Sequence, residues 1–308
     1  MSKKTAPDLK TRNEFTNDYP PVEHFMRDCG QWIEWDGENY TAGMPATPYV
    51  CAEPGGVRLG IWASLADLIG GAVATRAVRP DWIATSDMTV HLFSPLHEGE
   101  LRVVARLLRQ GRRTVIIEVD LLDAEADQTP IGMATLGFSV LKARGPIQQM
   151  KSGDEPNRTD FAHADKALDR DILSRLGAEA LDPAEGRIRL ETSAYSSNTL
   201  GATQGGVLAL LADEAGQLLG RERGEAQWVT RDMTLHYLAL GRTGPLETRA
   251  RLLHPGPESA LVRVEILDRG ESDRRVLAAT LRVGDIQSSH GLTQPEPVPG
   301  ASGPNSGA

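Results

Sequence analysis

The heptapeptide TSDMTVH at residues 85–91 returns as TRDMTLH at residues 230–236, 145 positions later in the chain. The same offset relates two further pairs of segments, ARLL (105–108 and 250–253) and ATL (134–136 and 279–281). One spacing held over three separate motifs indicates an internal duplication. The chain of 308 residues is long enough to hold two domains of ordinary size.

Each copy predicts the same order of secondary structure, one helix followed by four strands. The periodicity of apolar residues predicts helices at 59–77 and 205–221. Alternating segments predict strands near 84–93, 101–109, 113–122 and 131–141, their equivalents in copy two, and earlier strands at 32–44 and 187–196. A helix with an antiparallel meander predicts an α+β fold, a sheet curled around one central helix. Two such copies can pair edge to edge and cover their exposed strands.

Composition divides the chain into two domains, a linker and two tails. The linker and the ends are polar, and the stretch 288–308, which is rich in Gly and Pro, buries too little apolar area to order itself. The predicted ranges are a disordered tail at 1–22, domain 1 at 23–145, a linker at 146–165, domain 2 at 166–287 and a disordered tail at 288–308.

Charge and cysteine content exclude several classes of function. The net charge of −9, without a stripe of Lys and Arg, argues against binding to nucleic acid. Cys29 and Cys51 lack metal-ligand spacing, and no metal or cofactor is expected. The apolar stretch 61–78 carries Asp67 and Arg76, so it predicts a core helix and not a membrane span. With no signal peptide visible, the expected location is the cytoplasm.

Copy two contains a motif that can carry chemistry. Asn198 and Gly201 precede Gln204-Gly205-Gly206 at the start of the predicted helix. A helix start with glycines presents free N–H groups and a positive dipole, which can bind the oxyanion of a tetrahedral intermediate. Hydrolysis also needs a carboxylate, as a general base or as a nucleophile.

The acid in this helix, Asp213, lies eight residues beyond Gly205, about 12 Å along the axis at 1.5 Å per residue. It therefore cannot serve its own helix start. Antiparallel packing of the two helices would place each acid beside the start of the other. One predicted site then joins Gln204, Gly205 and Gly206 to Asp67, and the reciprocal site joins Asp213 to Arg58, Leu59 and Gly60.

Over residues 25–285 this pattern resembles the hotdog thioesterases of the phenylacetate-pathway (PaaI-like) and 4-hydroxybenzoyl-CoA groups. The resemblance implies tandem hotdog domains that form a pseudo-dimer and hydrolyse acyl-CoA or aryl-CoA thioesters without metal. It implies catalytic roles for Asp67, Asp213, Asn198, Gln204, Gly205, Thr85 and Thr230, and substrate binding by Gly206, Arg58 and Gly60. Gln204 stands where the family has His, and copy one lacks both the Asn and the paired glycines.

Several alternatives stay open at this point. The chain could be a non-catalytic acyl-CoA-binding protein, or an enoyl-thioester hydratase, and assembly beyond the internal pair is undetermined. The small residues Ala63, Gly70 and Ala74 could line a ligand site or fit the helix to its sheet. Strict alternation places Thr85, Asp87, Thr89 and His91 on one strand face, where the aspartate and histidine are expected at an exposed or interface position. The arginines at 106, 109, 112 and 113 could hold CoA phosphates, but a solvated hairpin is the preferred interpretation.

Overall fold

The computed structural model describes residues 19–52, 55–126, 129–142, 155–163, 167–222, 228–256 and 258–285. The predicted tail at 288–308 lies outside the described residues, as does the predicted tail at 1–22 except for its last four residues.

Each copy contains one long helix, with strands before and after it. Copy one has α1 (Phe25–Asp28), β1 (Trp32–Trp35), β2 (Tyr40–Pro45), β3 (Cys51–Ala52), β4 (Gly56–Val57), α2 (Leu59–Val78), β5 (Trp82–Leu92), β6 (Glu100–Gln110), β7 (Thr114–Asp123) and β8 (Thr129–Leu141). After β9 (Asn157–Asp160), copy two has α3 (Ile172–Leu176), β10 (Glu179–Asp182), β11 (Arg187–Leu190), α4 (Gly205–Glu222), β12 (Trp228–Tyr237), β13 (Leu246–Pro255), β14 (Ser259–Asp268) and β15 (Arg274–Asp285). Short 3-10 turns cover Pro48–Val50, Pro183–Glu185, Ala194–Ser196 and Arg269–Glu271.

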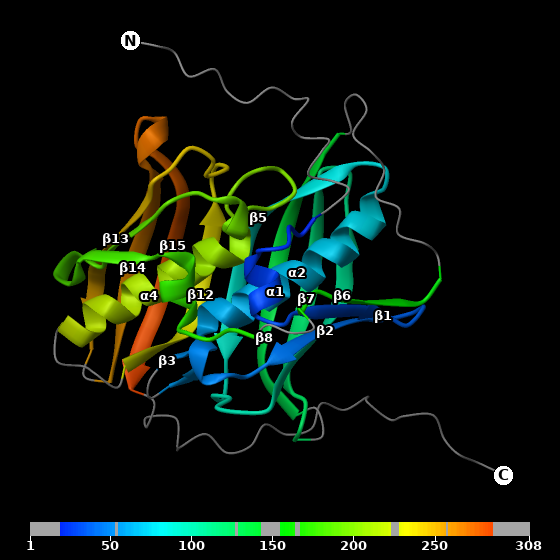
Figure 1. Cartoon of the computed structure of the whole chain (residues 1–308), viewed down its shortest axis with the longest axis horizontal. Coiled ribbons are helices and arrows are strands. Elements are labelled where there is room, and N and C mark those ends of the chain that lie inside the picture. Colours follow the sequence, from blue (N-terminus) through cyan, green and yellow to red (C-terminus); the bar gives the residue numbers. More distant parts are fainter. Residues whose placement is uncertain are drawn as a thin grey trace.

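The two copies share one antiparallel sheet. Its 13 strands run in the order β10-β11-β13-β14-β15-β12-β5-β8-β7-β6-β2-β1-β9. The long helices α2 and α4 lie side by side on the same face of this curved sheet, one in front of each half (Figure 1). The predicted α+β fold, two hotdog domains forming a pseudo-dimer, is confirmed.

The repeated heptapeptides form the junction between the halves. Thr89 of β5 lies opposite Thr234 of β12. Every residue pair on one side of this point has a two-fold-related pair of equivalent residues on the other side. The Nδ1 atom of His91 lies 2.6 Å from Oδ1 of Asp232 across the junction. The contact is thus isologous, as in a two-fold dimer. It also covers one edge of each half-sheet, that of β5 and that of β12, as the edge-pairing argument predicts.

A β-bulge at the start of both junction strands overturns the strict alternation expected there. Thr85 and Asp87 face successive residues of β8, Phe138 and Gly137, so Ser86 is the extra residue. The face therefore changes at the bulge. Thr85 turns to the helix side of the sheet while Asp87 stays exposed on the outer side. The same shift occurs in β12 between Thr230 and Asp232.

Glycines set the distance between the two helices. A Cβ atom on Gly60 would lie 2.4 Å from Cα of Leu210, and one on Gly206 would lie 2.5 Å from Cα of Ser64. Backbone meets backbone at both points, so no side chain fits. The small face behind them rests on the sheet, since a Cβ on Gly70 would be 3.3 Å from Leu136 and Phe138. That outcome matches the packing interpretation of the small residues. Although α2 is long and apolar enough to cross a membrane, most of it is buried inside the molecule.

Two segments differ from the sequence-based prediction. The range 32–44 is a hairpin and not one strand, because Oδ1 of Asp36 accepts the backbone N–H groups of Glu38 and Asn39 and Gly37 adopts a φ of 108°. The range 187–196 is a strand only as far as Leu190. Within the range predicted as a linker, β9 pairs with β1 and extends the sheet of copy one.

We expect the Gly60→Ala substitution to destabilise the fold by about 1–3 kcal/mol, because its methyl group would push the two helices apart. Gly71→Ala is the matched control on the same helix. Its Cβ would meet only Cδ1 of Ile83, at 3.9 Å, so the alanine should stabilise the helix by about 0.5–1 kcal/mol. Thermal unfolding of both variants measures the difference. Equal midpoints for the two variants would contradict the close helix contact.

Candidate active site

Asp67 of copy one meets the start of α4 in copy two. Its Oδ1 atom accepts a hydrogen bond from Oγ1 of Thr85 at 2.8 Å, and the carboxylate also accepts the backbone N–H of Gly206. A Cβ atom on Gly205 would lie 2.7 Å from Oδ2 of Asp67. A side chain at Gly205 would therefore press on the Asp67 carboxylate in its present position.

The environment of Asp67 raises the pKa of its carboxyl above the ordinary value. Burial raises the pKa of this carboxyl to about 6, while the hydrogen bonds from Thr85 and Gly206 lower it and so limit the rise. A carboxyl with this pKa is mostly ionised at pH 7 and still basic enough to take a proton from water.

A cavity of about 1440 Å³ opens beside Asp67. The predicted residues Asn198, Gln204, Gly205, Gly206 and Thr85 all contribute to its wall. The structure thus brings these residues together with Asp67 around one large space. Strand β9, in the range predicted as a linker, also lines this cavity.

The loop before α4 holds Asn198 by its side-chain oxygen. This Oδ1 atom accepts the backbone N–H groups of Leu200 at 2.9 Å and Ala202 at 3.2 Å. The carboxamide has one acceptor oxygen and two N–H donors, so its donors are what Asn198 can offer to a ligand.

Gln204 is held by the first described residues of the chain. Its Nε2 atom donates to the hydroxyl of Tyr19 and lies 3.3 Å from Sδ of Met26. Its backbone N–H donates to the carbonyl of Ser196 at 2.8 Å. With the amide nitrogen engaged, the side-chain oxygen is the atom that remains for a ligand.

The sequence-based argument missed two tyrosines in this wall. Tyr19 lies in the predicted tail, and nothing in the sequence sets it apart. Tyr237 follows directly after the second heptapeptide, and its hydroxyl donates to the carbonyl of Gly205 at 3.1 Å. Copy one has Leu92 at the equivalent position, so this difference between matched positions was an available signal. Burial raises the pKa of both tyrosines, and the charge of Asp67 adds to the effect.

The reciprocal acid, Asp213, meets the start of α2. Its Oδ2 atom accepts the backbone N–H of Gly60 at 2.8 Å, and its Oδ1 atom accepts Nε2 of Gln217 at 2.7 Å. Asp213 is fully buried, and Thr230 is 2% exposed. The hydroxyl of Thr230 has no hydrogen-bond partner within the described part of the chain.

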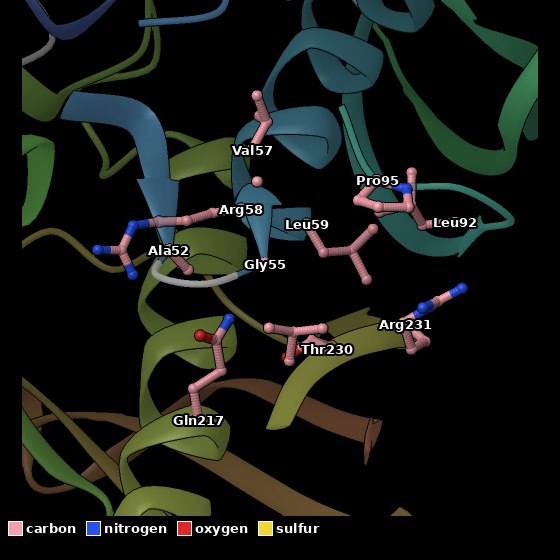
Figure 2. A pocket seen from close by; sticks show the side chains of 12 residues that line it. Ala52, Gly55, Val57, Arg58, Leu59, Leu92, Pro95, Gln217, Thr230 and Arg231 are labelled. Carbon is pink, nitrogen blue, oxygen red and sulfur yellow. The ribbon is translucent and has the colours of Figure 1, made fainter. Parts of the chain in front are cut away.

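The space at the reciprocal position is closed. Its volume is about 10 Å³, which is room for one water molecule at most. In Figure 2, Leu59 and Thr230 lie on either side of this narrow space and Gln217 reaches up from α4. Leu59 stands where copy two has Gly205, and Gln217 stands where copy one has Gly71. Two larger side chains thus fill what two glycines leave open in the other site.

Arg58 and Gly60, predicted to bind substrate, are engaged within the protein. The guanidinium of Arg58 forms ion pairs with Glu214 at 2.6 Å and Asp171 at 3.0 Å, and its side chain is 10% exposed. It points away from the closed space in Figure 2. The N–H of Gly60 donates to Asp213. These contacts explain Arg58 and Gly60 as parts that join the two copies.

The family model of the thioesterase superfamily matches both copies, at residues 59–129 and 200–273. No curated protein sequence matches the chain. Among solved structures, a thioesterase candidate from Novosphingobium aromaticivorans is 16% identical with a TM-score of 0.57, over 82% of this chain and 98% of its own. A candidate oleoyl thioesterase from Lactobacillus plantarum is 11% identical with a TM-score of 0.56, over 82% and 99%.

A third solved structure, an acyl-ACP thioesterase from Bacteroides thetaiotaomicron, is 13% identical with a TM-score of 0.52, over 79% of this chain and 96% of its own. At these identities the structural likeness shows the fold. Each copy thus matches the thioesterase superfamily, at residues 59–129 and 200–273, and the chain has the tandem hotdog fold.

Proposed function

We propose that this protein hydrolyses acyl-CoA or aryl-CoA thioesters at the open site around Asp67. The observation that carries the proposal is the meeting of this buried acid with the glycine helix start of the other copy, beside a large cavity. Hydrolysis needs a carboxylate that takes a proton from water or attacks the carbonyl carbon. It also needs hydrogen-bond donors for the oxyanion that forms.

In this proposal, the Gly205 N–H and the Asn198 carboxamide hydrogens bind the thioester carbonyl oxygen. Asp67 then acts in one of two ways. As a general base it takes a proton from the water that attacks the carbonyl carbon, and the C–S bond then breaks as the thiolate leaves and takes this proton from Asp67. As a nucleophile it forms an acyl anhydride and expels the thiolate, and water then cleaves the anhydride and supplies the proton that the thiolate takes up. Both routes yield a carboxylate and a thiol.

Supporting residues hold the reacting groups in place. Thr85 fixes the Asp67 carboxylate, and Tyr237 fixes the first peptide of α4 through the Gly205 carbonyl. Gln204 offers a carboxamide at the position where the resembled family has His. In a hotdog hydratase we would expect a His paired with an acid on the long helix. Neither α2 nor α4 contains His, which disfavours that alternative. The acyl carrier can be CoA or a carrier protein, as the name of the Bacteroides thetaiotaomicron neighbour illustrates.

The two acids should differ sharply in importance. Asp67→Asn should lower kcat/KM about 10²-fold or more, because asparagine neither accepts a proton nor attacks carbon. Asp213→Asn should leave most of the activity, since the space beside it is closed. A thiol-release assay over short, long and aromatic acyl-CoAs measures both, with thermal unfolding to verify that each variant is folded. Greater damage from Asp213→Asn would overturn the proposed site.

The rate should depend on pH through Asp67. Because the ionised form is the reactive one, kcat/KM should rise as the pH passes through about 6 and level off above it. Thr85→Val removes a hydrogen bond that stabilises the charged form, so this limb should move to higher pH.

Thr230→Val is the matched control for the pH profile. It makes the same change in the closed site, where the hydroxyl has no described partner, and should leave the profile unchanged. A limb that stays in place in Thr85→Val, or moves equally in both variants, would show that Asp67 does not set the pH dependence.

A further inference from the structure

The cavity beside Asp67 continues along one face of α2. Residues of this helix and its C-cap line it at spacings of three and four, which is one stripe on a helix: Ser64, Asp67, Leu68, Gly71, Ala72, Thr75, Arg76 and Arg79. Gly71 and Ala72, in the middle of the stripe, are small and leave space for the cavity. The cavity therefore runs from the acid to two arginines at the far end of the helix.

The far end of this cavity combines positive charge with aromatic rings. The guanidinium carbon of Arg76 lies 3.6 Å from the ring centre of Trp35, which stacks on Tyr40 with ring centres 6.1 Å apart. Trp82 and Arg79 line the same region. Glu34 also lines this region, and its carboxylate is paired with Arg158 at 3.2 Å.

The equivalent stripe in copy two lacks this combination, and its arginine, Arg221 at the position of Thr75, is paired with Glu214. Gln217 and Leu218 replace Gly71 and Ala72, and Glu222 replaces Arg76. An arginine near a helix C-terminus also stabilises the helix dipole, and this general benefit applies to both copies. The combination of small residues, arginines and tryptophans occurs in the copy whose cavity is open.

Distance and chemistry define what this end can bind. Arg76 lies nine residues beyond Asp67, about 14 Å along the axis at 1.5 Å per residue. Arginine binds carboxylate or phosphate through paired N–H donors, and tryptophan faces accept cations and flat rings. A ligand whose thioester lies at Asp67 would reach this end with an anionic group on a spacer of that length.

We propose that Arg76, Arg79 and Trp35 form a subsite for an anionic group of the thioester substrate, about 14 Å from Asp67. The inference rests on the proposed thioester site. The anion has two sources, the phosphates of the CoA nucleotide on the thiol side or a terminal carboxylate on the acyl side. The same arginine chemistry serves both.

Binding tests this subsite separately from turnover. In the full-length Asp67→Asn protein, quenching of tryptophan fluorescence and calorimetry would follow four probes. These are CoA, pantetheine, and the N-acetylcysteamine thioesters of a monocarboxylic and a dicarboxylic acid of equal length. The test variant adds Arg76→Gln and Arg79→Gln, and a second adds Arg76→Lys and Arg79→Lys, which keep the charge but lose the paired donors. Arg106→Gln is the control, since that exposed arginine pairs with Asp120 and Glu118 outside the cavity.

The glutamine variant should bind the anionic probe at least tenfold more weakly and bind its uncharged counterpart unchanged. Loss confined to CoA, with pantetheine unaffected, assigns the subsite to the nucleotide. Loss confined to the dicarboxylic thioester assigns it to the acyl group. Equal binding of all probes by the glutamine variant and its parent overturns the subsite. If the glutamine variant is misfolded, the same comparison with the lysine variant decides.

Turnover separates this inference from the proposed function. Absence of thiol release with arginine-dependent binding intact would refute the hydrolase and leave the subsite. Normal thiol release, together with binding that does not depend on the arginines, would support the hydrolase and refute the subsite.

Discussion

The close antiparallel contact of α2 and α4 determines the rest of this molecule. Gly60 against Leu210, and Gly206 against Ser64, bring the two backbones together at symmetric points. Only at this separation can each aspartate accept an N–H from the start of the opposite helix. The shared sheet holds the helices in this register, because the junction of β5 and β12 has the same two-fold centre. One constraint thus accounts for the helix faces, the strand pairing and the position of both acids.

Within this symmetric frame the two acid positions have diverged. The backbone contacts of Asp67 and Asp213 are equivalent, yet Asp67 lines a cavity of about 1440 Å³, whereas Asp213 is fully buried and the space lined by Gln217 and Thr230 has a volume of about 10 Å³. The change is local. Leu59 for Gly205 and Gln217 for Gly71 fill the volume, and Gln217 also satisfies the second oxygen of the buried acid. A buried carboxylate needs such partners, so closing the space and satisfying the charge are linked.

The sequence predicts this architecture well because duplication carries long-range information. A fixed offset identifies equivalent residues, and the helical rise alone excludes Asp213 from its own helix start. The asymmetry of the two sites follows from Arg58-Leu59 opposite Gln204-Gly205 in the alignment. What the sequence could not reveal depends on contacts between distant segments. The bulge at Ser86 turns Thr85 toward Asp67, Tyr19 reaches Gln204 from the far end of the chain, and β9 completes a cavity wall.

The covalent link between the copies has a consequence for how the site is assembled. Asp67 and the Gly205-Gly206 helix start come from different halves, which in a dimer of separate subunits would come from different molecules. Here the tether gives each half a local concentration of its partner that dilution cannot reduce. The site therefore stays complete at any protein concentration. The tether also fixes which half supplies the acid and which supplies the helix start, a division of labour that two identical subunits could not maintain.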